Sequence, residues 1–303
     1  MDTSVANLPL YLQPWWWNAA TGSPDNWQAA RIISPEGKLL AYWPCYRRRR
    51  FGFLNIYTPP PLCMHSGPWL RPAETESNPA KSLSRAWRLV NELLEQLPKA
   101  HYWRTKAPYS FDNGMALQRA GWRQVVKYSY QLPTQSFVTE EEISSRFAPH
   151  ARQQLKKAAS ILTIREAPTV ELQISLILKA FQAKGERKSR FPIAAFRRVC
   201  QAAAQNNAAV SWQAMDAENR VHATLWLAFD QERAYAILPA ADPELRTSGA
   251  MSLLFWQGIR WAQQQGLIFD FEGSAIPGVE EFYRGFGPEP VPYYVFRKGL
   301  PGL

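Results

Sequence analysis

A short apolar segment near the C-terminal end, Gly266 to Ser274, constrains this chain more than any other feature. Its hydrophobic run is interrupted by Asp270 and followed, after Phe271, by Glu272. Side chains two positions apart leave a strand on the same face, so both carboxylates share one face. Acidic groups on an otherwise apolar strand need hydrogen-bond partners or a chemical task.

The residues after this segment predict a short helix and a final strand. Pro277 suits the first turn of a helix, and the sequence Gly285-Phe-Gly287 is typical of a helix end. A last strand is expected over residues 291–298.

Composition limits the classes of protein to consider. The 303 residues are 46% hydrophobic and carry a net charge of +10, which favours a packed core and an anionic partner. The three cysteines follow no metal-binding or disulfide pattern, and the four histidines are scattered. We therefore expect a reduced, cytoplasmic protein without a metal, and no apolar stretch is long enough to suggest a transmembrane segment.

Hydrophobic periodicity predicts an alternation of strands and helices along the whole chain. The expected strands cover residues 29–33, 39–44, 51–57, 100–106, 122–132, 162–166, 209–215, 221–229 and 233–238. The expected helices cover residues 81–97, 111–120, 140–160, 170–183, 192–205 and 248–265.

Two parts of the chain repeat the same order of features. Residues 102–130 and 269–294 each read as a strand, a helix, a basic residue, a glycine, an aromatic residue and a second strand. This echo indicates two copies of one α/β (α+β) unit. We place the N-terminal domain at residues 1–140 and the C-terminal domain at residues 141–303.

The C-terminal motif resembles the closing half of the GNAT acyltransferase fold, and more closely its FemABX branch of aminoacyltransferase relatives. The resemblance is carried by Asp270-Phe-Glu-Gly273 and by the Phe286-Gly287 pair after the helix. It implies tandem GNAT-like domains, each with a mixed, mostly antiparallel sheet flanked by helices.

The same resemblance suggests catalytic residues. Tyr283 stands near the tyrosine that many GNAT enzymes use as a general acid, at a place where FemABX proteins usually have lysine. Asp270 and Glu272 could accept a proton from an attacking amine or hold the acceptor. Alternatively, one of them orients the turn at Gly273 and Ser274.

Several residues are expected to bind phosphate or substrate. GNAT enzymes bind the pyrophosphate of acyl-CoA at a helix N-terminus, where Arg246 and Gly249 match the motif and Met251 departs from it. The expected set is completed by the arginine run and by residues of the C-terminal motif: Arg47, Arg48, Arg50, Ser274 and Arg284. The basic loop 184–190 and the arginine run can also be read simply as solvated turns.

The resemblance therefore implies an acyltransferase that moves an acyl or aminoacyl group onto an amine, with acyl-CoA or aminoacyl-tRNA as co-substrate. The expected partner is a phosphorylated or nucleotide-bearing small molecule, or tRNA. The alternative is a catalytically degenerate GNAT-like protein that only binds an anionic ligand or partner.

Overall fold

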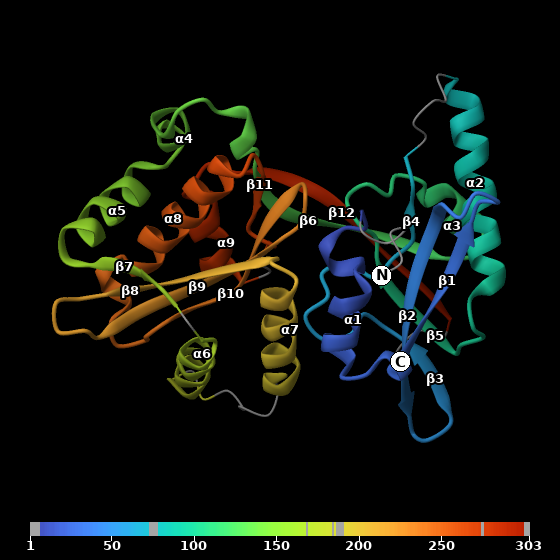
Figure 1. Ribbon diagram of the computed structural model, residues 1–303, viewed down its shortest axis with the longest axis horizontal. Helices are drawn as coiled ribbons and strands as arrows, with labels where there is room; N and C mark the ends of the chain where they lie inside the picture. Colours follow the sequence, from blue (N-terminus) through green and yellow to red (C-terminus); the bar gives the residue numbers. More distant parts are fainter. Residues whose placement is uncertain are drawn as a thin grey trace. The chain divides into compact units, whose positions relative to one another are not determined.

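The structure is a computed structural model that describes residues 7–72, 78–167, 169–183, 185, 191–273 and 276–299. The chain forms two compact units (Figure 1): Met1–Lys127 with Pro292–Leu303, and Tyr128–Val291. Helices flank mixed sheets in which most strand pairs are antiparallel, while β3 pairs with β5 and β10 with β11 in parallel. The fold class expected from the sequence is confirmed.

The first unit contains a sheet with strand order β1-β2-β3-β5-β12, and β4 pairs with β2. Its strands are β1 (Trp27–Ile33), β2 (Leu39–Arg50), β3 (Leu54–Tyr57), β4 (Trp69–Leu70), β5 (Tyr102–Lys106) and β12 (Glu289–Gly299). Its helices are α1 (Pro14–Thr21), α2 (Pro79–Gln96) and α3 (Gly114–Arg119).

Alternation along β2 places two different cores on the two faces of this sheet. Trp43 packs with Trp103 and Trp122 at ring-centroid distances of 6.3 and 5.4 Å, in a cluster with residues of α2 and α3. The next side chain back, Tyr42, joins a separate cluster with Leu8. Tryptophan residues thus fill the first unit's interior, because large aromatic side chains bury much apolar surface.

The second unit contains strands in the order β6-β11-β10-β9-β8-β7. These are β6 (Arg123–Leu132), β7 (Thr163–Glu166), β8 (Ala209–Met215), β9 (Val221–Phe229), β10 (Arg233–Ala241) and β11 (Ile268–Asp270). The helices are α4 (Glu140–Ser145), α5 (Pro149–Ile161), α6 (Glu171–Ala183), α7 (Ile193–Gln205), α8 (Ala250–Gln264) and α9 (Pro277–Arg284).

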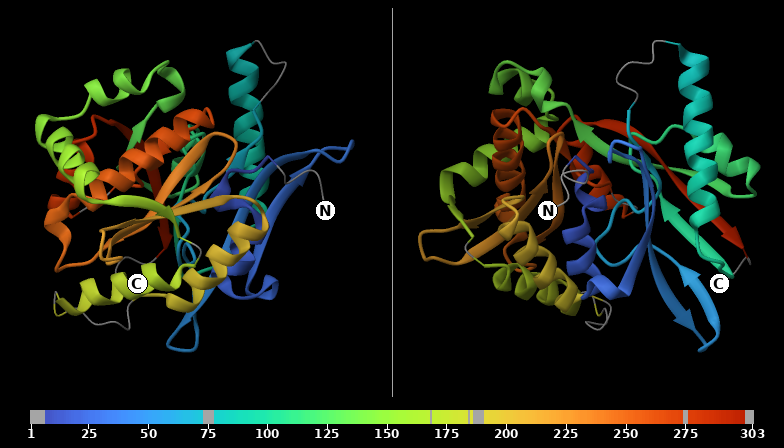
Figure 2. Two further views of the ribbon diagram at one scale, coloured as in Figure 1. Left: turned by 60° about the vertical axis from the view of Figure 1, so that its left-hand side comes forward. Right: turned by 45° about the vertical axis from the view of Figure 1, so that its right-hand side comes forward.

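Strand β9 shows how helices cover both faces of this second sheet (Figure 2). Leu225 and Leu227 join the core cluster formed with α8. Trp226 points the opposite way and packs against Phe196 of α7, with ring centroids 5.9 Å apart. Period-two alternation therefore fits a strand buried on both faces.

The sequence echo corresponds to two strand–helix–strand segments, β5-α3-β6 and β11-α9-β12. The last strand of each segment pairs with the first strand of the other: β12 pairs with β5, and β6 pairs with β11. Because of this exchange, the compact units divide at 127/128 and 291/292. The domain boundary predicted at 140/141 stays a proposal about the two repeated halves of the sequence. The compact units have other boundaries because they follow the hydrogen-bonded pairing of the strands.

Two local predictions were wrong. The arginine run is part of β2, which continues to Arg50, and the turn comes only at Phe51–Phe53. The expected helix over residues 140–160 is two helices, because Pro149 lacks the amide proton that a continuous helix needs and begins α5.

Removing the Phe296 side chain should destabilise the first unit selectively. Phe296 lies on β12 but is fully buried in the first unit's core, where its ring centroid is 6.0 Å from that of Phe111. Phe296→Ala should lower the free energy of unfolding by about 3–5 kcal/mol. Limited proteolysis with mass spectrometry should find the first cleavages in residues 1–127. The exposed neighbour Arg297→Ala is the control, and first cleavage within residues 128–291 would contradict the prediction.

Candidate functional site

The carboxylate of Asp270 is fully buried at the end of β11, and donors from three described residues hold it. It accepts hydrogen bonds from Ser129 Oγ at 2.8 Å, from Gln131 Nε2 at 2.8 Å and from the Glu272 amide at 2.7 Å. Both side-chain donors lie on β6, the strand paired with β11. Asp270 therefore orients the turn after β11, which was the structural alternative raised by the sequence.

The turn itself adopts left-handed backbone conformations. Gly273 has φ +64°, and a Cβ there would lie 2.9 Å from the carbonyl oxygen of Tyr128, so glycine is required. Glu272 has φ +60°, a conformation that non-glycine residues rarely adopt. Such backbone conformations persist where surrounding contacts impose them, and they are frequent in functional sites.

The carboxyl group of Glu272 has an unusual acidity. Burial disfavours its charged form and raises its pKa to about 8. A carboxyl group that titrates close to neutral pH can both accept and return a proton during a reaction. Among the acidic candidates expected from the sequence, Glu272 is the one suited to proton transfer.

Tyr283 lies on the inner face of α9, close enough to Glu272 for the two to interact electrostatically. Its side chain is 5% exposed and packs against Phe271 and Phe255, with ring centroids 5.2 and 5.6 Å away. Burial, and secondly the charge of Glu272, raises the pKa of Tyr283 above its ordinary value. Its hydroxyl forms no hydrogen bond with any other residue that the structure describes. The protonated hydroxyl is therefore available to donate a proton or a hydrogen bond.

The turn carrying Glu272 begins where two parallel strands stop pairing. The ladder between β10 and β11 ends at the pair Tyr235–Asp270, whereas β10 continues to Ala241. The register with β9 shifts after Ile237, and Leu238 has φ +50°. Gln173 of α6 donates to the carbonyl oxygens of both residues. The end of the ladder thus positions Glu272 beside a bulged strand.

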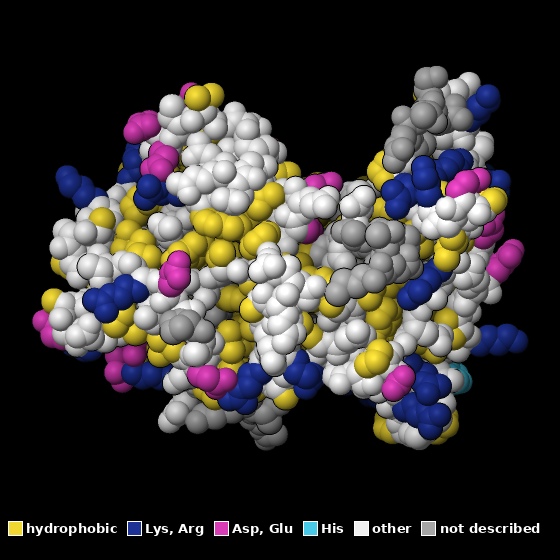
Figure 3. All heavy atoms as spheres, in the orientation of Figure 1, with side chains coloured by type: hydrophobic (Ala, Val, Ile, Leu, Met, Phe, Trp, Pro, Cys, Tyr) yellow, Lys and Arg dark blue, Asp and Glu magenta, His cyan; other side chains and the backbone are white. Residues whose placement is uncertain are grey.

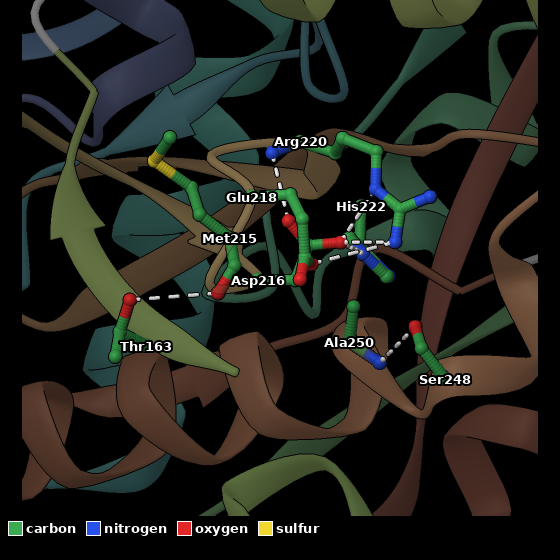
Figure 4. Close-up of polar contacts among 8 residues, drawn as sticks. All are labelled: Thr163, Met215, Asp216, Glu218, Arg220, His222, Ser248 and Ala250. Carbon is green, nitrogen blue, oxygen red and sulfur yellow. Dashed lines mark hydrogen bonds and ion pairs between the residues drawn. The ribbon is translucent and has the colours of Figure 1, made fainter. Parts of the chain in front are cut away.

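The turn before α8, which was expected to bind phosphate, packs against helix α5. Gly249 has φ +78°, and a Cβ there would lie 2.6 Å from the carbonyl oxygen of Gln154 on α5. Lys157 of α5 donates to the carbonyl oxygen of Thr247 at 2.8 Å. The hydroxyl of Ser248 accepts from the Ala250 amide at 3.4 Å (Figure 4). Close helix packing therefore explains the glycine at position 249.

The remaining expected binding residues fall in different surroundings. Arg246 is exposed on the turn before α8, whereas Arg284 forms an ion pair with Glu280 at 2.9 Å. Arg47, Arg48 and Arg50 are exposed on β2 of the first unit. Ser274 lies outside the described residues, as do all residues of the basic loop 184–190 except Gly185.

At the β8–β9 turn, Asp216 pairs with the buried His222, an arrangement not expected from the sequence (Figure 4). Asp216 accepts from His222 Nε2 at 3.0 Å and from Arg220 Nε at 2.7 Å. Chiefly the bond from His222, supported by Arg220, holds the pKa of Asp216 well below its usual range. No described serine, threonine or cysteine donates to His222. The only sequence signal for this pair was the position of Asp216 and His222 on either side of a tight turn between two expected strands.

A second missed residue, Lys106, lies at the end of β5. Burial, with a smaller effect of Arg104, lowers its pKa to about 8. Its Nζ is 4.0 Å from Met64 Sδ. The sequence around Lys106 reads as an ordinary strand and gives no sign that this lysine is buried.

Two other kinds of feature are absent from the described part of the chain. No group of three or more His, Cys, Asp and Glu residues there could hold a metal ion. None of its helices combines the length and the apolar character needed to cross a bilayer.

Known proteins share parts of this sequence and its fold. Residues 145–284 match the family described as an acetyltransferase (GNAT) domain. The whole chain is similar in structure to FemX, with a TM-score of 0.69 and 13% identity over 97% of this chain and 94% of that one. The chain has a GNAT fold, and its overall structure is similar to that of FemX. No curated protein sequence matches it.

Two further solved structures share this GNAT fold over most of their length. One is the C-terminal domain (DUF2156) of a candidate lysylphosphatidylglycerol synthetase from Agrobacterium fabrum, with a TM-score of 0.58, 14% identity and coverage of 98% and 90%. The other is a tandem GNAT protein from the clavulanic acid biosynthesis pathway, with a TM-score of 0.51, 8% identity and coverage of 98% and 92%.

The matched GNAT domain contains both Glu272 and Tyr283 but ends at Arg284 and begins after β6. The donors that fix Asp270, on β6, therefore lie outside the matched residues. The GNAT domain of this chain depends on a strand from the preceding part of the sequence.

Replacing Glu272 should change how stability depends on pH. The folded state keeps a proton that an unfolded glutamate releases near its ordinary pKa of 4.5, so the free energy of unfolding falls as pH rises from 4.5 to about 8. Glu272→Gln should stabilise the protein by roughly 2–4 kcal/mol at pH 9 and by little at pH 4.5.

Urea unfolding across this pH range, followed by circular dichroism, measures the effect. The exposed Glu281→Gln on α9 is the matched control. A stability difference between Glu272→Gln and the natural chain that stays constant with pH would contradict the raised pKa.

Proposed function

We propose that this protein transfers an acyl or aminoacyl group from an activated donor to an amine. The observation that carries the proposal is Glu272, a carboxyl group with a pKa of about 8 in a left-handed conformation at the end of β11. A general base works best when its pKa lies near the working pH. The GNAT match over residues 145–284 supports the same class of reaction.

In the proposed reaction, Glu272 accepts a proton from the attacking amine. The amine nitrogen forms a bond to the carbonyl carbon of the donor, and the bond from that carbon to the leaving oxygen or sulfur breaks. The proton held by Glu272 then passes to the leaving group. An amine and an ester or thioester thus give an amide and an alcohol or thiol, without a covalent enzyme intermediate.

Tyr283 would assist by stabilising the charge that develops on the carbonyl oxygen. Its raised pKa keeps the phenol protonated, and its hydroxyl is uncommitted within the described chain. A hydrogen bond to the oxyanion, in a site with little water, is worth more than the same bond in solvent. Asp270 does not touch the substrate in this scheme, because its carboxylate is already occupied by three donors.

Among donors, we favour aminoacyl-tRNA over acyl-CoA. The turn at Gly249, where GNAT enzymes hold the CoA pyrophosphate, packs against α5. The net charge of +10 suits a polyanionic donor. Of the arginines expected to bind phosphate, Arg246 is the proposed contact to the donor, and Arg284 would need to leave Glu280 to join it.

The proposal includes a cytoplasmic setting, supported by three buried cysteines that remain free thiols. The second candidate function is a GNAT-like protein that only binds an anionic partner. The aromatic packing of Tyr283, at a place where FemABX proteins usually have lysine, favours that alternative.

A donor screen separates the two functions. The protein is incubated with bulk aminoacyl-tRNA or with acetyl-CoA, together with a set of primary amines that includes a lysine-containing peptide. Mass spectrometry then detects amide products. Aminoacyl products support the proposal, and acetyl products overturn the donor preference. Thermal stabilisation by tRNA without any product would favour the binding protein.

Glu272→Gln should lower turnover by about 10²- to 10⁴-fold, because it removes the general base. For the natural chain, kcat/KM should rise with pH and level off above an inflection near 8, where Glu272 becomes ionised. The variant should lack that inflection. A natural profile that is flat between pH 6 and 9 would exclude Glu272 as the base.

Tyr283→Phe should lower turnover by about 10²-fold, because one oxyanion donor is lost while the ring still packs. Stability should change little, since no hydrogen bond to a described residue is removed. Tyr57→Phe in the first unit, whose ring stacks on Trp103 at 4.3 Å, is a control for losing a hydroxyl. Full turnover by Tyr283→Phe would remove this residue from the site.

A further inference from the structure

The β2–β3 hairpin extends past the sheet of the first unit (Figures 1 and 2). Its antiparallel register runs from Arg47–Tyr57 to Arg50–Leu54. Strand β5 pairs with β3 only at Ile56 and Tyr57. His101, just before β5, still bonds the backbone of Asn55. The outer part of the hairpin, residues 48–54, is therefore a two-stranded ribbon with no third strand beside it. We call residues 47–57 the arginine hairpin.

The arginine hairpin carries a dense, uncompensated positive charge. Arg47, Arg48, Arg49 and Arg50 are all exposed, and successive side chains on a strand point to opposite faces. No acidic residue occurs between Leu39 and Tyr57. None of the four arginines forms an ion pair with another described residue. Both faces of the ribbon therefore present guanidinium groups to solvent.

The tip of the arginine hairpin is apolar. Phe51 and Phe53 are each 70% exposed, which is high for phenylalanine, and Figure 3 shows hydrophobic side chains next to basic ones on this hairpin. Their only described ring contact is with the Arg50 guanidinium, 5.0 Å from the centre of the Phe51 ring. The rings add nothing to the core of the unit.

The backbone of the tip makes Phe51 more unusual. Phe51 has φ +53° and Gly52 has φ +77°, both in the left-handed region, within the three-residue turn between Arg50 and Leu54. Glycine and asparagine tolerate the left-handed region, whereas a bulky residue such as phenylalanine is disfavoured there. The turn would fold better with asparagine, so folding does not account for this exposed phenylalanine.

We propose that the arginine hairpin docks this protein onto an anionic lipid bilayer. The two phenylalanine rings would enter the boundary between headgroups and acyl chains, and the arginines would bind lipid phosphates. At about 3.3 Å per residue, the arginines stand roughly 3 to 13 Å behind the tip. That depth matches the headgroup layer of a leaflet. The inference rests on the hairpin alone and is independent of acyl transfer at Glu272.

The shape of the hairpin favours a bilayer over RNA. Proteins that bind single-stranded RNA usually stack bases on aromatic rings along a groove or sheet face, with basic groups beside them. Here the aromatic rings are confined to the end of the ribbon and the charges follow behind on both faces. An apolar tip in front of a charged layer has the order of layers found in a bilayer surface.

Vesicle binding tests the proposal with the full chain. Large unilamellar vesicles of phosphatidylcholine with 40% phosphatidylglycerol, and of phosphatidylcholine alone, are sedimented with the protein. We expect binding only to the anionic vesicles, weakened by salt. Phe51→Asn and Phe53→Ser should each weaken binding by about 10-fold. The double variant Arg48→Gln/Arg50→Gln should weaken it by roughly 20-fold.

Stability separates a docking role from a folding role. Phe51→Asn should keep or raise the melting temperature, since asparagine suits the left-handed turn, while vesicle binding falls. Matched controls are Val138→Asn, which changes a side chain that is 86% exposed elsewhere, and Arg165→Gln/Arg297→Gln, which removes two exposed charges. Both controls should bind anionic vesicles like the natural chain.

A fluorescent label locates the contact directly. Cys45, Cys63 and Cys200 are buried, and burial raises the pKa of each thiol, so they react poorly with labelling reagents. An environment-sensitive dye on Phe53→Cys should shift to the blue when anionic vesicles are added, and the same dye on Val138→Cys should not.

Three outcomes would overturn the proposal. The first is no binding to anionic vesicles at low salt. The second is equal loss of binding in the hairpin variants and the controls. The third is binding of bulk tRNA, without vesicle binding, that the same hairpin variants weaken, because this would assign the hairpin to a nucleic acid.

Discussion

The buried carboxylate of Asp270 is the interaction on which the candidate site depends. A charge removed from water must be compensated by hydrogen bonds, and three donors supply them. One donor is the Glu272 amide. The hydrogen bond that compensates the buried charge of Asp270 therefore also fixes the backbone of Glu272. Glu272 is thereby held in a left-handed conformation that it would rarely adopt alone. The proposed base owes its position to a residue that takes no part in the chemistry.

The other donors to Asp270 come from β6 and link the site to the exchange of strands. Ser129 and Asp270 are 141 residues apart in sequence but 2.8 Å apart in the structure. The complementary strand, β12, completes the sheet of the first unit against β5. Each unit therefore includes a strand from the other half of the sequence. A cut between the two halves would leave each unit without a strand and Asp270 without two of its donors.

Two non-glycine residues in left-handed conformations mark the places where we propose function. At Glu272 the conformation is imposed by buried hydrogen bonds and accompanies a pKa of about 8. At Phe51 it is imposed by a tight hairpin turn and accompanies an exposed ring. Neither residue is the one that would best satisfy its local backbone. At these two positions the departure coincides with a second unusual property, a raised pKa or an exposed ring.

The sequence alone determined the elements around the site, because their signals are local. The strand with two carboxylates, the short helix after Pro277 and the echo between the two halves all follow from periodicity and turn residues. Tertiary structure alone decided what these residues can do. Asp270 and Glu272 look equivalent in the sequence, yet β6 donors occupy the first and burial raises the pKa of the second. Such properties depend on groups brought together from distant parts of the chain, which no local pattern encodes.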